Sequence, residues 1–570
     1  MTIKTDVLVI GAGGAGARAA IEAAMNDPKL SIVILNQGPI GKSGLTSMAN
    51  GGMQWVSHPD DSPCALFEDI IQIGCYLNDQ NLVEAVVKEG PARAEELIRW
   101  GAKMLPHKGG GGGSPDTPPG KPSYPRGHYI PGVTYMAALR NELERHPNVI
   151  ALEDVIATKL LTAGKRVIGA FVLNIRTGEY VVIEAKATVL AAGGLGELYP
   201  HSTNAPFGMH GHAAGMGYAM AYYAGAELID MEMVQFTGNQ LYPPWLLGNP
   251  ALLSSMCGGK YVNALGKEFL KLPQPRDALQ RLAYKEIKEG RGTERGGVYI
   301  DLTLSPLPSE EIEKQLKLSL AEEIAKERWK LIKAMSVNDP DPKNWRVEFT
   351  PGGAHFFMGG VRINERCETN LEGLFAAGEV SGGLHGANRM GGNAMVEIIV
   401  FGARAGRSAA EYAKRIDRVE SKEAPEGEYE RLCGFFKSRG TAPKIIMDKI
   451  ATFMAEYVGV ARTEADLTKA LSEIESLRAD GLPNLRAPQG RRFNLGWVEA
   501  IQVPYMLDVA EMIVRAALFR TESRGAHYRE DYPETRSDWL KHTRIIKNRG
   551  FMDLTAVPVV VTQFKEEEKR

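Results

Sequence analysis

Cysteine is scarce in this sequence, and its few copies lie far apart. The 570 residues include five cysteines, at positions 64, 75, 257, 367 and 433, and no C-x-x-C pair. This spacing carries no signature of an iron–sulfur cluster, a structural zinc site or c-type haem attachment, so we expect no metal centre. Isolated cysteines are more often small buried apolar residues than ligands.

An excess of one charge and a long apolar run are also missing. Lysine and arginine total 67, and aspartate and glutamate 69, which gives a formal net charge of −2. This balance gives no support to a nucleic-acid or membrane-surface partner. No apolar run reaches the roughly 18 residues of a membrane span, and the chain enters a strand-like run at Asp6 without room for a signal peptide. We therefore expect a cytoplasmic protein, or one at the cytoplasmic face of a membrane complex.

The sequence does contain a glycine-rich turn near its N-terminus. Asp6–Ile10 is a short β-branched apolar run that predicts a buried strand. The turn Gly11–Gly16 follows as G-x-G-x-x-G, and the alanine-rich run Ala17–Met25 predicts a helix. A second strand, Leu30–Leu35, ends at Asn36, where an acidic ribose partner is usual. This order favours a dinucleotide site, with a pyrophosphate at the helix N-terminus, over a purely structural turn.

Arg389 stands in the most informative segment, Leu384–Ala394, which reads Leu-His-Gly-Ala-Asn-Arg-Met-Gly-Gly-Asn-Ala. Glycines on both sides let a backbone approach a planar ligand closely. A fixed arginine presents a planar fork that suits a carboxylate. The segment therefore predicts an anion site beside a bound ring.

The length predicts about three or four domains, because one compact core rarely supports so many residues. Changes in composition suggest residues 1–236 and 351–415 as two parts of the dinucleotide-binding domain, 237–350 as an inserted lobe, 416–530 as a helical domain and 531–570 as a tail. The glycine- and proline-rich segment Lys108–Arg126 must be loop. Strands are expected from Ile150 to Ala192, helices at Glu464–Arg478 and Met506–Arg520, and a strand at Val557–Val561.

Further segments follow one another in a fixed order along the chain. They are Ala49-Asn50-Gly51-Gly52, Ala191-Ala192-Gly193-Gly194, Thr203-Asn204, Ala224–Glu232, Met358-Gly359-Gly360, Gly373–Glu379 and Glu522–Arg529. Together with the opening turn and the segment around Arg389, they resemble the flavoprotein subunits of fumarate reductase and succinate dehydrogenase, with L-aspartate oxidase as a cousin. The resemblance covers nearly the whole chain. It implies an α/β fold with a Rossmann-like FAD-binding domain, an inserted α+β capping domain and a C-terminal helical domain.

The resemblance also implies FAD as the cofactor. The residues that correspond to its binding segments are Gly11, Gly13, Gly14, Gly16, Asn36, Gln37, Ser43, Thr46, Asn50, Gly51, Gly52, Ala192, Gly193, Glu379, Asn393 and Ala394. The respiratory enzymes tether FAD through a histidine, and Leu45 occupies that position here. We therefore expect non-covalent FAD, with a lowered flavin potential that favours reduction of the substrate.

Three residues match the family's catalytic positions. Arg389 matches the arginine that binds the substrate carboxylate, and His355 matches a substrate-binding histidine. Arg276 matches the arginine that delivers the proton, which works despite its high pKa only if a relay replaces that proton. On residue type alone, His355 would be a core histidine and Arg276 a salt-bridged surface arginine. Arg524 and His527 are expected to be structural.

The chain departs from the family in its dicarboxylate pocket. The motif His-Pro-Thr-Gly is missing after Gln235-Phe236, and the Thr-Glu pair of the proton relay is not recognisable in Ala251–Gly259. His210 and His212 lie in a short insertion, and Asn239, Gln240 and His212 are expected to line a modified pocket. The substrate is therefore expected to be a small carboxylate that need not be fumarate.

Three functions remain open at this point. The first is a fumarate-reductase-type enzyme that receives electrons from a separate iron–sulfur subunit, since the chain has no cluster motif of its own. The second is an amino acid oxidase of the L-aspartate type. The third is an electron-transfer flavoprotein subunit whose pocket is inactive. The combination of Arg276, His355 and Arg389 favours the first.

Overall fold

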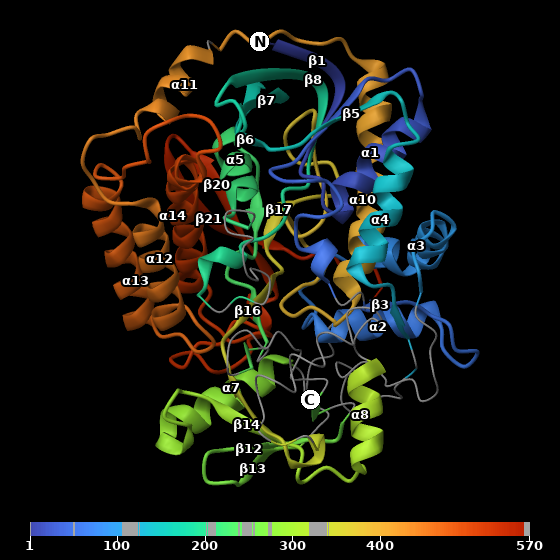
Figure 1. Cartoon of the computed structure of the whole chain (residues 1–570), viewed down its shortest axis with the longest axis vertical. Helices are drawn as coiled ribbons and strands as arrows, with labels where there is room; N and C mark the ends of the chain where they lie inside the picture. Colours follow the sequence, from blue (N-terminus) through green and yellow to red (C-terminus); the bar gives the residue numbers. More distant parts are fainter. Residues whose placement is uncertain are drawn as a thin grey trace.

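A computed structural model of the chain describes residues 2–49, 52–104, 124, 126–200, 202, 213–237, 240–241, 253–254, 257–271, 276–318, 339, 341–423 and 425–563. Figure 1 shows a sheet with packed helices at the top of the view, a smaller lobe at the bottom and a group of helices on one side. The predicted loop Lys108–Arg126 lies almost entirely outside the described residues, and so does the segment Thr203-Asn204.

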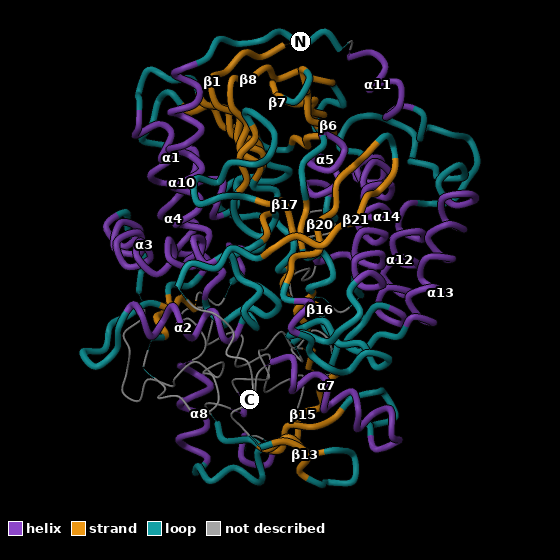
Figure 2. The backbone as a smooth tube through the Cα atoms, turned by 180° about the vertical axis from the view of Figure 1, so that it is seen from behind, coloured by secondary structure: helices purple, strands orange, loops and turns teal. Residues whose placement is uncertain are grey.

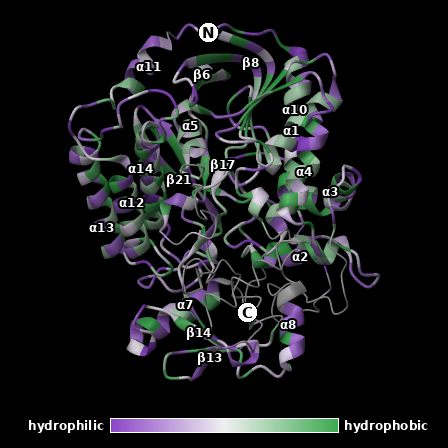
Figure 3. Ribbon diagram, in the orientation of Figure 1, coloured by the Kyte–Doolittle hydropathy of each residue, from purple (hydrophilic) through white to green (hydrophobic). Residues whose placement is uncertain are grey.

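The N-terminal strand β1 (Thr2–Ile10) is central to a seven-stranded sheet. The strand order is β5-β2-β1-β8-β7-β6, and β18 also pairs with β8. These strands are β2 (Ile32–Leu35), β5 (Val149–Leu152), β6 (Val155–Ala163), β7 (Arg166–Asn174), β8 (Tyr180–Leu190) and β18 (Leu374–Ala376). The pairs of β1 with β2 and β8, of β2 with β5 and of β8 with β18 are parallel, whereas β6, β7 and β8 form an antiparallel meander. Figure 3 shows the hydrophobic residues on these strands, as expected for a sheet covered on both faces.

Helix α1 (Gly14–Asn26) follows β1 and packs along α10 (Asn393–Arg415). A Cβ at Gly406 would lie 2.1 Å from the carbonyl oxygen of Ala19, so glycine allows the two helices to approach closely. Helix α3 (Gln80–Arg99) packs on α10, α4 (Gly132–Leu143) packs on α1, and α2 (Pro63–Ile73) packs on α3. This packing brings the glycine-rich turn next to the segment that carries Arg389, although the two are more than 370 positions apart.

The smaller lobe contains a second, antiparallel sheet with its own apolar core. The strand order is β11-β15-β14-β12-β13. The strands are β11 (Gln240–Leu241), β12 (Lys260–Val262), β13 (Glu268–Leu270), β14 (Val298–Asp301) and β15 (Arg346–Thr350), and the helices are α7 (Arg276–Glu286) and α8 (Ser309–Leu318). Tyr261, Ile300, Trp345 and Phe349 are buried in its core. The predicted inserted lobe is therefore an α+β unit, and its exact boundaries stay a prediction.

A third sheet connects the middle of the chain to its C-terminal part. Its order is β19-β17-β9-β20-β21, formed by β9 (Leu228–Ile229), β17 (Gly360–Arg362), β19 (Ser381–Gly382), β20 (Lys541–Asn548) and β21 (Phe551–Pro558). Figure 2 shows the β20–β21 hairpin lying beside β17. The predicted strand Val557–Val561 is wrong in its bounds, because the ladder between Lys541 and Pro558 ends β21 at Pro558.

Four helices form the side group: α11 (Pro425–Cys433), α12 (Pro443–Tyr457), α13 (Glu464–Ser476) and α14 (Leu495–Phe519). The prediction of Glu464–Arg478 matches α13 closely. The prediction of Met506–Arg520 is too short, since α14 begins eleven residues earlier. Sixteen residues of α14 are buried, including Trp497 and Tyr505, so its outer turns lack the amphipathic period that marks a surface helix.

The remaining elements are short. They are η1 (Thr46–Met48), β3 (Gly52–Gln54), β4 (Gly127–Tyr129), η2 (Gly196–Leu198), α5 (Met216–Ala224), β10 (Val234–Phe236), η3 (Ile287–Arg291), η4 (Pro342–Asn344), β16 (Ala354–Phe357), η5 (Leu477–Gly481) and η6 (Ser537–Trp539). Within the described part of the chain, no helix combines the length and apolar character needed to cross a bilayer.

Candidate active site

The glycine-rich turn joins β1 to α1 in a shape that two of its glycines require. Gly11 has a φ of +99°, and a Cβ there would lie 2.3 Å from the carbonyl oxygen of Ala191. A Cβ at Gly16 would lie 1.8 Å from the carbonyl oxygen of Gly11. Gly14 donates its N–H to Thr46 Oγ1 at 3.2 Å. The turn, the first residues of α1 and Thr46 therefore form one edge of the site, where helix N–H groups favour a phosphate.

Asn36 connects the end of β2 to this turn. Its Oδ1 accepts the N–H of Ala12 at 3.1 Å, and its Nδ2 donates to Gly38 O and to Ser43 Oγ, both at 2.8 Å. An amide has two N–H donors, and both are used within the chain. Asn36 can therefore meet a ligand only through its oxygen, and the half-buried Gln37 follows it.

Glu379 lies against the residues that follow β8. Gly193, next to Ala192, has a φ of +77° and open space where a Cβ would stand, while a Cβ at Gly194 would lie 2.3 Å from Glu379 Cδ. Glu379 Oε1 accepts the N–H of Phe357 at 3.2 Å. Burial raises the pKa of Glu379 to about 8, although the N–H of Phe357 acts in the opposite direction. A carboxyl that is largely protonated at neutral pH can donate a hydrogen bond as well as accept one.

Asn393 and Ala394 begin α10 next to the end of β3. A Cβ at Gly392 would lie 2.9 Å from Cγ of Gln54, which places the two segments in contact. Asn393 Oδ1 and Gln54 Oε1 are buried acceptors with no hydrogen-bond partner among the residues that the structure describes. Buried acceptors are normally satisfied, so this corner suits a ligand that brings its own N–H or O–H donors.

Arg389 is 4% exposed and lies over an aromatic ring. Its guanidinium carbon is 4.7 Å from the ring centroid of Phe356, and its Nη1 donates to Met390 O at 3.3 Å. His385 meets the same ring edge-on, with centroids 5.1 Å apart, and its Nε2 lies 2.9 Å from Glu397 Oε2. The guanidinium is thus held in a fixed, partly desolvated place, where it attracts a carboxylate strongly.

The structure places the other two predicted catalytic residues on neighbouring elements. His355 is a half-buried residue of β16 and directly precedes Phe356, the ring that Arg389 covers. Arg276 is the first residue of α7, but its side chain lies outside the described part. The same holds for the predictions on Asn50, Gly51, His210, His212 and Asn239 and for the side chain of Gln240.

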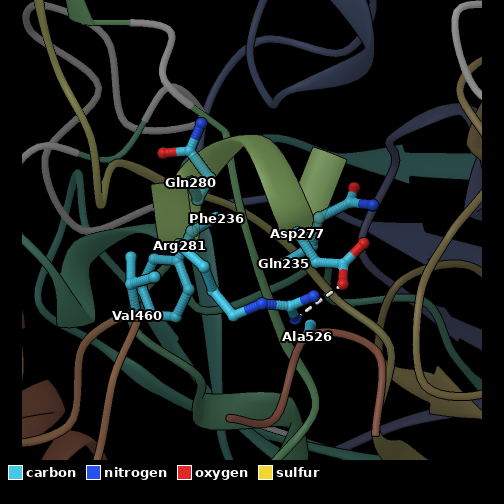
Figure 4. A pocket seen from close by; sticks show the side chains of 7 residues that line it. All are labelled: Gln235, Phe236, Asp277, Gln280, Arg281, Val460 and Ala526. Atoms are coloured by element: carbon cyan, nitrogen blue, oxygen red, sulfur yellow. Dashed lines mark hydrogen bonds and ion pairs between the residues drawn. The ribbon is translucent and has the colours of Figure 1, made fainter. Parts of the chain in front are cut away.

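A hydrogen-bonded network of side chains connects α7 to the Arg389 segment (Figure 4). Gln235 Nε2 donates to Asn388 Oδ1 and to Arg389 O, both at 2.9 Å. Asn388 Nδ2 donates to Asp277 Oδ1 at 3.0 Å. Arg281 Nη1 donates to Asp277 Oδ2 at 2.7 Å and to a backbone carbonyl, that of residue 525, at 3.0 Å. Burial raises the pKa of Asp277, although Arg281 acts to lower it.

Comparison with known proteins identifies the family. Residues 6–395 match the model of an FAD binding domain, and residues 447–570 match that of the fumarate reductase flavoprotein C-terminus. One subunit of the fumarate reductase (CoM/CoB) of Methanothermobacter marburgensis is 40% identical over 563 residues, which cover 96% of this chain and 97% of that protein. The chain belongs to the fumarate reductase/succinate dehydrogenase flavoprotein family. As a member, it is an FAD-dependent oxidoreductase subunit.

Solved structures of family members confirm the predicted fold class. The FrdA flavoprotein of Escherichia coli quinol fumarate reductase superposes with a TM-score of 0.87 at 28% identity, covering 100% of this chain and 99% of that one. The Sdh1 complex of Mycobacterium smegmatis contains a chain with a TM-score of 0.84 at 31% identity, with coverages of 99% and 96%. The Rossmann-like FAD-binding domain, the capping domain and the C-terminal helical domain are therefore those of the family.

The residues present in this flavoprotein fit FAD. The turn at Gly11 and Gly16 leaves space for a pyrophosphate, which its N–H groups can bind. The buried acceptors of Gln54 and Asn393 suit the ring N–H and hydroxyl donors of a flavin. Glu379 offers a carboxyl that can donate or accept. FAD as cofactor is confirmed, whereas the individual contacts stay predictions.

Sequence reasoning missed several residues of this site in the family member. Asp277, Arg281, Asn388, His385 and Glu397 were not predicted, although the structure places them around Arg389 and Phe356. A signal existed for one pair, since Asp277 and Arg281 are an acidic and a basic residue four positions apart on a helix. Arg524 and His527 are buried in a charged cluster with Glu522 and Arg462, in line with their expected structural role.

Proposed function

We propose that this flavoprotein reduces the C–C double bond of a small unsaturated carboxylate, with fumarate as the first candidate. The observation that carries the proposal is the position of Arg389, buried over Phe356 in the loop that leads into α10. A buried guanidinium in a fixed orientation attracts a carboxylate with little competition from water. The fumarate reductases among the relatives support the choice of substrate.

Each residue has one task in this reaction. Arg389 binds a carboxylate and so fixes one end of the substrate, and His355 contacts the substrate from β16. Bound FAD supplies a hydride to one carbon of the double bond. Arg276 holds the proton that the neighbouring carbon receives. Loss of the family's histidine after Phe236 leaves the second carboxylate with different partners, so enoates with one carboxylate are candidates too.

We propose that electrons arrive from a separate iron–sulfur subunit. The relative from Methanothermobacter marburgensis is named as one subunit of its enzyme, and that name includes CoM/CoB, which supports a multi-subunit arrangement. The cysteines of this chain contain no C-x-x-C pair, so the cluster would belong to a partner. The cytoplasmic location expected from the sequence stays a prediction.

The test is anaerobic oxidation of reduced viologen by the purified, FAD-loaded protein, with fumarate and a small panel of other enoates. Arg389→Lys should lower kcat/KM at least about 30-fold, because removing a buried charged contact costs about 2 kcal/mol or more. Lysine keeps the charge but cannot form the bidentate pair. FAD content and thermal stability are measured on the same samples.

Arg404→Lys is a matched control on α10. Arg404 donates to Glu89 at 2.6 Å from its Nη2, well along the helix from Asn393. This variant should keep kcat/KM near that of the unmodified protein. Equal activities of the Arg389→Lys variant and the unmodified protein would contradict the assigned role of Arg389, and no turnover with any enoate would contradict the proposed function.

A further inference from the structure

A small cavity lies at the start of α7, next to the segment that carries Arg389 (Figure 4). Its volume is about 10 Å³, and it is lined by Gln235, Phe236, Asp277, Gln280, Arg281, Val460 and Ala526. This volume is close to the smallest that holds one water molecule. The lining is mostly polar, as a site for water requires.

Two buried amide atoms facing this cavity have opposite hydrogen-bonding character. Gln235 uses both N–H donors of Nε2 in bonds to Asn388 and Arg389, which fixes its Oε1 as an acceptor. Gln280 accepts the N–H of Gly352 at 3.0 Å through Oε1, which fixes its Nε2 as a donor. Both glutamines are 1% exposed. Gln235 Oε1 and Gln280 Nε2 have no hydrogen-bond partner within the described ranges, and one water molecule can satisfy both.

Asp277 borders the same cavity and connects it to the substrate side. One of its oxygens accepts from Asn388, whose own oxygen accepts from Gln235, and the other accepts from Arg281. The side chain of Asp277 is 12% exposed, and that of Arg281 is 32% exposed. The pair therefore reaches from solvent to the Arg389 segment. Burial raises the pKa of Asp277, which helps its carboxyl hold a proton.

Asp277 is also the next residue after Arg276, the proposed proton donor. The family's Thr-Glu relay pair is not recognisable in this chain, so a different group must replace the proton that Arg276 gives up. We propose that Asp277, through one water molecule held by Gln235 and Gln280, supplies this proton. The inference rests on the proposed function and adds a residue that acts through Arg276.

The proton count closes over one turnover. Arg276 gives one proton to the substrate carbon and becomes a neutral guanidine. The carboxyl of Asp277 gives its proton to that guanidine and becomes a carboxylate. The cavity water then protonates the carboxylate and is itself reprotonated from solvent, so that one proton is taken from solvent for each double bond reduced.

The experiment compares Asp277→Asn with the unmodified protein in the anaerobic viologen assay with fumarate. Asparagine keeps the shape and a hydrogen bond but cannot transfer a proton. The variant should lose about 100-fold in kcat, the usual contribution of a positioned proton-transfer group. Its KM, its FAD content and the rate at which dithionite reduces its FAD should stay close to those of the unmodified protein. Asp277→Glu, which keeps the carboxyl, should recover a large part of kcat.

The pH profile separates proton supply from a purely structural role. Because Asp277 must be protonated to donate, kcat of the unmodified protein should fall as pH rises through the raised pKa of Asp277. That fall should disappear in Asp277→Asn. The charged residue next to Asp277 on α7 is Arg281, Arg276 precedes it, and the facing segments present the amide of Asn388 and the backbone at residues 525–526.

Glu286→Gln serves as the matched control. Glu286 lies on the same helix, but its carboxylate pairs with Arg291. This variant should keep both kcat and the pH profile. An unchanged kcat or pH profile in Asp277→Asn, beside an active unmodified protein, would overturn only the proton supply. An unmodified protein that reduces no enoate would overturn the proposed function and the proton supply together.

Discussion

Glu379 shows what a single buried carboxyl implies for this protein. It is held between the turn after β8 and the N–H of Phe357, and burial raises its pKa to about 8. A raised pKa means that the folded state binds the proton more tightly than the unfolded state does. The stability that this group contributes is therefore complete below the unfolded pKa and is lost as pH rises through about 8.

Glu379→Gln should remove this pH dependence, because glutamine resembles the protonated carboxyl. The melting temperature of the unmodified protein should fall between about pH 7 and 9, and that of the variant should fall less. Thermal unfolding across this pH range is the measurement. The pKa of Glu286 is lowered, first by the hydrogen bond from Arg291, so Glu286→Gln should keep the unmodified protein's fall. A parallel fall in Glu379→Gln would contradict the assignment.

Leu45 determines how FAD is held. It stands at the position of the family's tethering histidine, and an aliphatic side chain cannot form that bond. Acid or heat denaturation followed by filtration should therefore release all of the flavin. Flavin that stays with the precipitated protein would show a covalent bond at another residue.

At the scale of the elements, local signals predicted the parts of the fold that depend on local geometry. The turn between β1 and α1 was predicted because Gly11 and Gly16 are required by close backbone contacts a few residues away. By contrast, the network of Asp277, Asn388 and Gln235 joins residues 111 and 153 positions apart. No periodicity or spacing signals a contact between such distant residues, so the network could be found only in the folded chain.

The start of α14 illustrates a second limit. Trp497 and Val498 are buried near its N-terminal end, and Asn494 caps the helix by accepting the N–H of Trp497 at 3.0 Å. A helix that is covered all round loses the alternation of apolar and polar faces on which prediction relies. The first turns of α14 were therefore missed, whereas α13, with one buried face, was predicted almost in full.

Gly16→Ala tests the turn as an element. The new Cβ would lie 1.8 Å from the carbonyl oxygen of Gly11, so the backbone must move. We expect a loss of about 1–3 kcal/mol of stability and a clear loss of bound FAD. Absorbance gives the flavin content, and urea unfolding gives the stability. Gly427→Ala in α11, where a Cβ meets nothing within 4 Å, should change neither; full FAD content in Gly16→Ala would contradict the tight turn.

At the scale of the whole molecule, Arg520 connects three parts of the chain. This fully buried residue after α14 donates to Glu232 at 2.6 Å, to Glu522 at 2.9 Å and to Lys541 O at 2.6 Å. It thereby joins the helical group, the segment after β9 and the start of β20. A buried charge network of this kind determines how the parts fit together, and it is destabilised strongly when one partner is removed.

Arg520→Met should lower the free energy of unfolding by about 3–5 kcal/mol, because Glu232 and Glu522 would stay buried without their cation. Urea unfolding is the measurement. Arg478→Met is the control, since Arg478 pairs with Asp508 at the surface and its side chain is 40% exposed. A surface pair is worth about 1 kcal/mol or less. Equal losses in the two variants would contradict the role of Arg520.

The pairing of β9 has a consequence for the synthesis of the protein. Ile229 of β9 pairs with Gly360 of β17 on one side and with Arg544 of β20 on the other. A ribosome adds about 5–20 residues per second, so β9 and β17 wait on the order of ten seconds or more before β20 emerges. During that time β9 presents an open edge to other nascent chains. A message truncated before Lys541 would therefore yield a chain that aggregates, even though most of its FAD-binding residues had already been made.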